Sequence, residues 1–309
     1  MHFTKPLSAN IEADLQIAFS TGLHLDEETE PHLEGALRHT LERPGRLVRA
    51  HLAYEIAHAY GLSERRSKDL AIAIEYFHTA SLVFDDLPCM DDATERRGEP
   101  CIHRTHGEAA AVLAALGLIN RAYALLWRTL ATLPVRSQSR AGTYVEECLG
   151  LEGVLNGQSE DLHFGSLAYE RRSPQKVATG KTVSLIRLSL VLPALLGGAR
   201  EGELQLLERL AAFWGLSYQI LDDLNDVFQQ SSQAAKTTAR DEPLNRPNMV
   251  LSFGPGESLR RLERLLALGD QVLARLMARI PSLDFLEELR ARFHLEISAI
   301  KAGNFSPAL

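Results

Sequence analysis

The stretch that decides the fold runs from residue 203 to 226, ELQLLERLAAFWGLSYQILDDLND. Its inward-facing positions recur every three or four residues, at Leu206, Leu210, Phe213/Trp214, Ser217 and Ile220/Leu221. This period predicts an amphipathic α-helix that packs one face against a core. The predicted helix ends in three carboxylates, Asp222, Asp223 and Asp226, which packing against a core does not explain.

The same period recurs along most of the chain, and turn signals such as Gly61 and the Gly-Pro-Gly at 254–256 separate the segments. We find no convincing strand, heptad array or short repeat. The pattern predicts a single all-α domain over residues 1–309, a bundle of about ten or more helices. Besides 203–226, the expected helices are 45–61, 66–87, 107–132, 136–157, 175–198, 257–279 and 282–301.

Composition narrows the classes of function. The 309 residues are 45% hydrophobic and carry a formal net charge of -7, the balance of a soluble globular protein rather than of a nucleic-acid binder. No signal peptide is recognisable, and no uninterrupted apolar run approaches the ~20 residues that cross a bilayer. Cys89, Cys101 and Cys148 form no disulfide or zinc pattern. We expect a cytoplasmic protein with no nucleic-acid partner and no membrane span.

A first acidic motif, DDLPCMDD at residues 85–92, ends an apolar helical stretch. Four carboxylates in eight residues repel one another unless a cation screens them, and all-oxygen ligands suit Mg2+. Positions six apart do not share a face of a straight helix. We therefore expect Pro88 to break the helix and to let Asp91 turn back towards Asp85.

A second acidic motif, QILDDLND at residues 219–226, needs no such break. Gln219, Asp222 and Asp226 are spaced 0, +3 and +7, which places them on one face of a helix. A lone DDxxD pattern occurs by chance in many acidic helices. Two such motifs at similar helix ends indicate a shared metal-dependent site.

Basic residues follow both motifs. Arg96 and Arg97 come after the first motif, and Lys236 and Arg246 come after the second. Carboxylates and cations gathered together are typical of a metal-bridged polyanion site, in which Arg and Lys hold the phosphate oxygens. Two polar stretches are expected to be loops over that site, residues 91–107 and 229–249.

Lys181 and His78 are two further candidates. Gly180-Lys181-Thr182 is not a P-loop, because Gln175 stands where that motif needs glycine and no strand precedes it. A lysine within an apolar helical segment needs a partner, and phosphate is a reasonable one. His78 lies two helical turns before Asp85 on the same face, along the row that ends in the first acidic motif.

Together these residues resemble the trans-isoprenyl diphosphate synthases, and most closely the bacterial, carotenoid-type geranylgeranyl diphosphate synthases. The similarity covers roughly residues 40–255. Ala50 stands where proline is commoner in that family. The matching motifs, in chain order, are Gly45-Arg46-Leu47-Val48-Arg49, His78 through the first acidic motif to Arg96-Arg97-Gly98, Gly157-Gln158 with Asp161, Lys181-Thr182, Gln219 to Asp226, and Lys236 with Asp241 and Arg246.

The resemblance implies an all-α isoprenoid synthase fold around a central cavity, a homodimer, and the condensation of isopentenyl diphosphate with allylic diphosphates. It also implies Mg2+ as cofactor, with three ions per site once diphosphate is bound. The metal ligands would be Asp85, Asp91 and Asp222, supported by Asp86 and Asp226. The allylic diphosphate would be held by Arg96, Lys181, Thr182, Gln219, Lys236 and Arg246. Isopentenyl diphosphate would be held by Arg46, Arg49, His78 and Arg97. The implied catalytic set is Asp85, Asp86, Asp91, Arg96, Lys181, Asp222 and Lys236.

Product length can be argued from the helix that precedes Asp85. One helical turn rises ~5.4 Å, roughly one isoprene unit. Ala80 and Ser81, one turn back, are small and leave a tunnel open, whereas Tyr76 and Phe77, one turn further, are bulky. We expect the tunnel floor at these aromatics and hence a twenty-carbon product, geranylgeranyl diphosphate. If the aromatics pack elsewhere, fifteen or twenty-five carbons are equally allowed.

Three alternatives stay open. A fifteen-carbon farnesyl diphosphate synthase differs only in the tunnel floor. A terpene cyclase also uses an aspartate-rich metal motif, but it needs no isopentenyl diphosphate site. A non-catalytic subunit of a heteromeric synthase would be expected to lack one of the two acidic motifs. The sequence does not decide the preferred allylic primer or the pathway.

Overall fold

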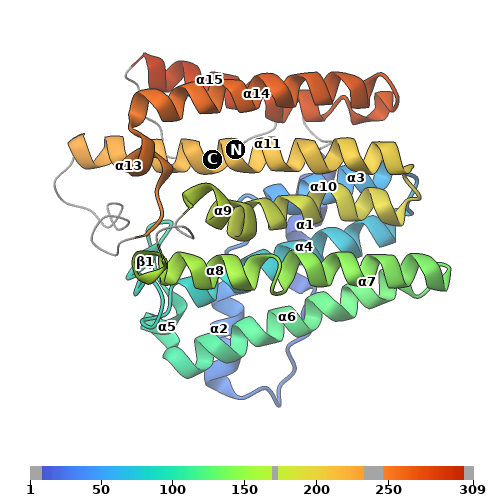
Figure 1. The fold of residues 1–309 in the computed structure, drawn as a ribbon. Coiled ribbons are helices and arrows are strands. Elements are labelled where there is room, and N and C mark those ends of the chain that lie inside the picture. Colours follow the sequence, from blue (N-terminus) through green and yellow to red (C-terminus); the bar gives the residue numbers. More distant parts are fainter. Residues whose placement is uncertain (1–8, 169–172, 233–245, 303–309) are drawn as a thin grey trace. The chain divides into compact units, whose positions relative to one another are not determined.

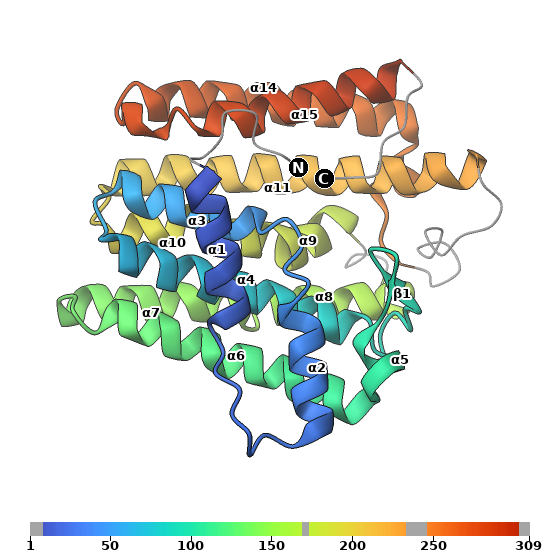
Figure 2. The same ribbon diagram turned by 180° about the vertical axis from the view of Figure 1, so that it is seen from behind.

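The computed structural model describes residues 9–168, 173–232 and 246–302. The chain divides into two compact units, Met1–Gln138 and Ser139–Leu309. Both units are built almost entirely of helices, which confirms the all-α prediction (Figures 1 and 2). The first unit holds the first acidic motif and the second unit holds the second.

The first unit is organised around one apolar helix, α4 (Glu64–Asp85), which packs against α3 (Val48–Ala59) and α6 (Glu108–Leu130). Helices α1 (Ala9–Thr21) and α2 (Pro31–Leu41) complete the unit, with α1 beside α4 and α2 beside α6. Most of α4 is buried on several sides, which is why its sequence shows only a broad apolar pattern. The acidic end of α4 is therefore held by a rigid, buried helix.

The polar stretch 91–107 is not a plain loop, and the expectation of no strand was wrong at this one place. It holds an antiparallel pair of two-residue strands, β1 (Glu95–Arg96) and β2 (Glu99–Pro100), and then the short helix α5 (Ile102–His106). The two residues between the strands, Arg97 and Gly98, both have positive φ, 58° and 82°. A two-residue turn with positive φ at both positions matches the twist of a β-hairpin.

The second unit is organised around the 32-residue helix α11 (Glu201–Ser232), which contains the apolar stretch 203–226. Leu210 and Trp214 are fully buried along it, as the apolar period predicts. Helices α10 (Ser184–Leu196) and α14 (Pro255–Met277) pack against α11. The remaining described elements are α7 (Val135–Leu149), α8 (Val154–Leu162), η1 (Phe164–Ser166), α9 (Pro174–Ala178), the π-helical segment η3 (Thr179–Val183), α13 (Met249–Phe253), η4 (Pro281–Leu283) and α15 (Leu286–Lys301).

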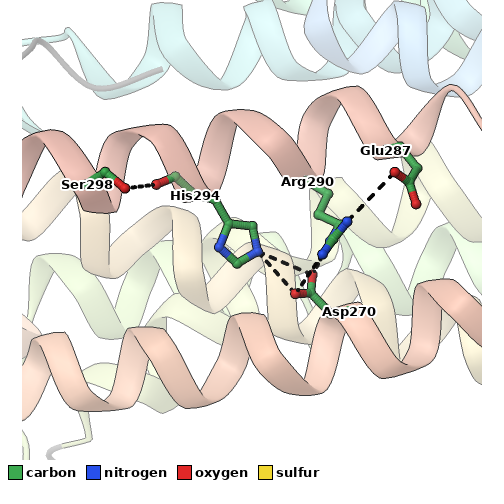
Figure 3. A network of polar contacts seen from close by, with 5 residues as sticks. All are labelled: Asp270, Glu287, Arg290, His294 and Ser298. Atoms are coloured by element: carbon green, nitrogen blue, oxygen red, sulfur yellow. Dashed lines mark hydrogen bonds and ion pairs between the residues drawn. The ribbon is translucent and has the colours of Figure 1, made fainter.

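One carboxylate of α14 pins α15 to it (Figure 3). Asp270 accepts from Arg290 Nε at 2.7 Å and faces His294 Nε2 at 3.1 Å. Arg290 also lies 3.7 Å from Glu287, and Ser298 donates to the carbonyl oxygen of His294 at 2.8 Å. These contacts fix the helical hairpin that covers α11.

Three predicted boundaries were wrong. The stretch 136–157 is two helices, because the chain turns at Gly150 and Gly153. The stretch 175–198 is divided by η3. The second polar stretch begins later than residue 229, since α11 runs on to Ser232.

Two helical stretches, Glu108–Leu130 and Pro174–Leu196, are long and apolar enough in composition to cross a bilayer. Neither is an uninterrupted apolar run, because single charged residues such as Arg121 and Arg187 interrupt both. Of their most apolar windows, 44% and 67% respectively is buried inside the protein. Core helices pass the same test of composition, so the absence of a membrane span stays a prediction.

Candidate active site

The first acidic motif folds back on itself, as Pro88 led us to expect. Helix α4 ends at Asp85, since a proline ring at position 88 would clash with a continuing helix. The backbone N–H of Asp91 donates to the carbonyl oxygen of Asp85 at 3.0 Å, and that of Ala93 donates to Asp86 at 3.1 Å. The return of Asp91 to Asp85 is therefore confirmed, and both residues are half-buried.

Asp86 is engaged differently from its neighbours. Its side chain is only 8% exposed and accepts from Arg96 in a two-pronged pair, from Nε at 2.8 Å and from Nη2 at 2.7 Å. Burial alone would lower the pKa of Arg96, but the hydrogen bonds and the negative charge of Asp86 outweigh that effect and raise the pKa overall. The guanidinium therefore stays charged. Asp86 therefore anchors the hairpin to the end of α4, which fits a supporting role.

The hairpin tip delivers Arg97 to the turn before α3. The guanidinium of Arg97 lies against Gly45, where an added Cβ would come within 2.0 Å of Nη1. Gly45 also has a φ of 66°, so glycine is needed there both for space and for conformation. Arg46, the next residue, is exposed.

Beside this turn, α3 and α4 form a charged cluster. Arg49 Nη1 donates to His78 Nε2 at 3.0 Å, and the buried carboxylate of Glu75 accepts from the backbone N–H of Ala50 at 2.9 Å. Burial lowers the pKa of His78 well below its usual range, and Arg49 and Arg97 lower it further. His78 is thus a neutral acceptor for Arg49. Sequence reasoning missed Glu75, although a carboxylate within an otherwise apolar stretch is itself a signal.

The four residues proposed to set chain length face different neighbours. Tyr76 is fully buried and points to α1, where its hydroxyl donates to the carbonyl oxygen of Phe19 at 2.6 Å. Phe77 stacks edge-on with Tyr123 of α6, with ring centroids 4.9 Å apart. Ala80 is fully buried and Ser81 is half-buried. The two aromatics are therefore not one continuous floor, and their role in chain length stays a prediction.

The second acidic motif lies in the middle of α11, not at its end. Gln219 connects two partners, since its Oε1 accepts from Thr182 Oγ1 at 2.7 Å and its Nε2 donates to Asp223 at 2.9 Å. The other oxygen of the buried Asp223 accepts from the backbone N–H of Met249 at 2.6 Å. Asp223 thus fixes the start of α13, while Asp222 and Asp226 stay half-buried. The i, i+4 spacing of Gln219 and Asp223 could have shown this pair.

Lys181 has a protein partner that the sequence argument did not foresee. Its Nζ lies 3.0 Å from Asp161 of α8. The two elements meet closely because both carry glycine: Gly157 Cα is only 2.9 Å from an ideal Cβ on Gly180. The Gly157-Gln158 and Asp161 segment therefore positions Lys181.

Replacing Gly157 with alanine is expected to destabilise the protein by about 1–3 kcal/mol through overpacking. The added Cβ would lie 2.4 Å from the backbone nitrogen of Lys181 and 2.6 Å from the carbonyl carbon of Gly180. Thermal unfolding measures the loss. Gly142→Ala on α7 is the matched control, because an added Cβ there meets nothing within 4 Å and alanine favours the helix. Equal melting temperatures for the two variants would contradict the prediction.

The remaining basic residues differ in what the structure says of them. Lys236 lies outside the described residues. Arg246 is half-buried just before α13.

Among the described residues, no group of three or more His, Cys, Asp or Glu side chains is close enough to hold a metal ion. The half-buried Asp85, Asp91, Asp222 and Asp226 nevertheless supply carboxylate oxygens, which suit Mg2+.

Comparison with known proteins finds relatives of this chain among named synthases. The chain is 34% identical over 229 residues to "Geranylgeranyl pyrophosphate synthase, chloroplastic" of Capsicum annuum, a match that covers 72% of this chain and 62% of that protein. The chain thus spans less than two thirds of the Capsicum annuum protein's length. It is 29% identical over 276 residues to a geranylgeranyl diphosphate synthase of Pantoea ananas, covering 89% of both.

The fold also matches a solved structure. A crystal structure of a geranyltransferase from Helicobacter pylori agrees with a TM-score of 0.76 at 25% identity, covering 93% of this chain and 96% of that one. Residues 30–267 match polyprenyl synthetase, which is well over half of the chain. The protein therefore belongs to the polyprenyl synthetase family.

Proposed function

We propose that the protein is a short-chain trans-prenyl diphosphate synthase that joins isopentenyl diphosphate to allylic diphosphates over one catalytic domain, residues 1–309. The observation that carries this proposal is the end of α4. There Asp91 returns to Asp85, and the same helix bears His78, which holds Arg49. Carboxylates for a metal and guanidinium groups for a diphosphate thus come from one rigid helix and its immediate neighbours.

The family generally uses Mg2+, and we assign its ligands to the two acidic motifs. Asp85, Asp91 and Asp222 are the ligands and Asp86 and Asp226 support them, with three ions per site. When bound, Mg2+ supplies positive charge that stabilises diphosphate as a leaving group. The pairing of Asp86 with Arg96 supports its secondary part in this assignment.

Two separate groups of residues hold the two substrates. Arg96, Lys181, Thr182, Gln219, Lys236 and Arg246 hold the allylic diphosphate. Arg46, Arg49, His78 and Arg97 hold isopentenyl diphosphate. As the allylic C–O bond breaks, negative charge collects on the departing diphosphate, and fixed cations stabilise it. The double bond of isopentenyl diphosphate then attacks the allylic cation, and a proton is lost to the released diphosphate.

We further propose geranylgeranyl diphosphate as the main product, with farnesyl diphosphate as the alternative. Small residues one turn before Asp85 leave room for the growing chain, and Phe77 lies one turn deeper on the face of Ser81. The names of the relatives in Capsicum annuum and Pantoea ananas support the longer product.

A product assay tests the function directly. The purified protein is incubated with Mg2+, labelled isopentenyl diphosphate and, in separate reactions, the five-, ten- and fifteen-carbon allylic diphosphates. The products are dephosphorylated and sized by chromatography. We expect mainly the twenty-carbon alcohol. A fifteen-carbon product would keep the reaction and reject the tunnel floor, whereas no elongation from any primer would reject the synthase.

We also propose a homodimer formed through α6. Its exposed residues Leu113, Leu116, Tyr123 and Trp127 are 48–68% exposed and, with the exposed Asn120, are spaced alternately three and four apart. Residues with that spacing line the contact between two packed helices. The α6 helix of a second copy of the chain carries the same stripe, so the two stripes can pack against each other. Solvent is an unfavourable environment for such an apolar stripe.

Trp127→Glu is expected to shift the protein from dimer to monomer in sedimentation velocity, because it places a charge in the stripe. Leu295→Glu, on the exposed side of α15 at 69% exposure, should leave the dimer intact. A wild-type protein that sediments as a monomer would reject the dimer.

Finally, we propose that the protein works in a reducing compartment, the cytoplasm. All three cysteines lie in the described part of the chain and are free thiols. Disulfides form and persist in oxidising compartments.

A further inference from the structure

Glu75 is a buried carboxylate to which the reaction proposed above assigns no part. It lies on α4 about three turns before Asp85 and is 4% exposed. A carboxylate is costly to bury unless it is hydrogen-bonded and balanced by charge. Glu75 has both kinds of partner: the backbone N–H of Ala50, next to Arg49, and the charges of Arg49 and Arg97 of the proposed isopentenyl diphosphate site.

The first partner is the start of α3. Its N-cap residue, Leu47, is left-handed at φ 46° and supplies no side-chain hydrogen bond. Ala50 is the third helical residue, so its N–H has no acceptor within the helix. Glu75 Oε2 accepts from this N–H at 2.9 Å and so caps α3 from a neighbouring helix. A proline at position 50 would offer no such donor.

The second kind of partner is the positive charge of two nearby guanidinium groups, those of Arg49 and Arg97. Burial raises the pKa of Glu75, and the positive charge of Arg49, the hydrogen bond from Ala50 and the charge of Arg97 oppose that rise without cancelling it. One turn along α4, His78 accepts from Arg49 at 3.0 Å. Two successive residues of α3, Arg49 and Ala50, are thus held by two residues of α4 that lie one turn apart.

We propose that Glu75 is a positioning residue for isopentenyl diphosphate, an inference that rests on the function proposed above. Its carboxylate fixes the first turn of α3 through Ala50 and balances the charges of Arg49 and Arg97. The two guanidinium groups would otherwise repel each other when no diphosphate lies between them. Glu75 therefore keeps them in one orientation without touching the substrate.

Steady-state kinetics of Glu75→Gln tests the proposal. The amide keeps an acceptor for Ala50 but loses the charge. We expect the KM for isopentenyl diphosphate to rise about tenfold, the size of one lost charged interaction. The KM for the allylic diphosphate and kcat should stay within about twofold, because the carboxylate does not contact either reacting centre. Glu64→Gln, the same change at the exposed start of α4, should alter none of them.

A second pair of variants isolates the hydrogen bond. Glu75→Leu is compared in the natural chain and in an Ala50→Pro background, where no N–H remains to be satisfied. The rise in KM for isopentenyl diphosphate should be smaller in the proline background, since only the charge is then lost. Equal rises in both backgrounds would overturn the capping role.

The outcomes separate this inference from the function itself. Wild-type turnover decides whether the protein is a synthase. With turnover present, an unchanged KM for isopentenyl diphosphate in Glu75→Gln overturns the proposal. Loss of kcat and of both affinities in step with a lower melting temperature also overturns it, because Glu75 would then be merely structural.

Discussion

Asp85→Asn is expected to lower kcat by about a hundredfold to a thousandfold. This is the loss that follows removal of one preorganised electrostatic group. Asparagine keeps the shape of the side chain and lets α4 end where it does, so the fold should survive. The substitution removes a negative charge at the point where the chain brings Asp91 back. Mg2+ affinity should fall with it, since a neutral amide is a poorer ligand for a hard cation.

Asp92→Asn is the matched control for that loss. Asp92 belongs to the same acidic run, but it is exposed and paired with Arg104 at 2.6 Å. Its φ of 47° suits asparagine, so the backbone is not disturbed. Turnover should change less than about threefold, as expected of an exposed pair.

The same measurement decides between a synthase and a non-catalytic partner subunit. If the protein serves only as a scaffold in a heteromeric synthase, Asp85→Asn would leave the activity of the assembly unchanged. Turnover by the protein alone, lost in Asp85→Asn and kept in Asp92→Asn, would exclude that alternative.

Ser81→Phe is expected to change the main product from twenty to fifteen carbons. Ser81 lies one turn before Asp85 and is half-buried, and its hydroxyl donates to the carbonyl oxygen of His78 at 2.7 Å. A phenyl ring there would occupy the space of roughly one isoprene unit, ~5.4 Å of helix rise. Chromatography of the dephosphorylated alcohols measures the shift.

Tyr76→Phe is the control for chain length. The hydroxyl of Tyr76 points to Phe19 of α1, so its removal should leave product length unchanged. It should instead lower stability by about 0.5–1.5 kcal/mol, the net value of one hydrogen bond. If Ser81→Phe still gave twenty carbons, the growing chain would not run along this face of α4.

The sequence allowed two features of the site to be predicted, for clear physical reasons. The apolar period of α11 records which face is buried, and it continues through the second acidic motif. The return of Asp91 to Asp85 follows from the one residue that cannot continue a helix, Pro88. Both predictions rest on residues that are close in sequence, so they do not depend on which distant segments pack together.

Other features depend on partners that are distant in sequence. Glu75 acts on the backbone N–H of Ala50, and no side-chain pattern marks a backbone donor. The hairpin turn at Arg97-Gly98 lacks the asparagine or aspartate that usually marks it. Helix α2 was missed despite two start signals, the capping side chain of Glu30 and Pro31 in its first turn.

The π-helical segment η3 has a consequence for changes in chain length. Its wider turn holds one residue more than the α-helical path it replaces. Deleting Thr182 or Val183 would leave one regular helix over Pro174–Leu196, yet it would move Lys181 one position closer to α10 and change the direction in which its side chain points. A one-codon deletion could thus preserve the helix and still turn Lys181 away from Asp161. At this point of the chain, the direction of the Lys181 side chain depends on the number of residues in the turn as well as on their identity.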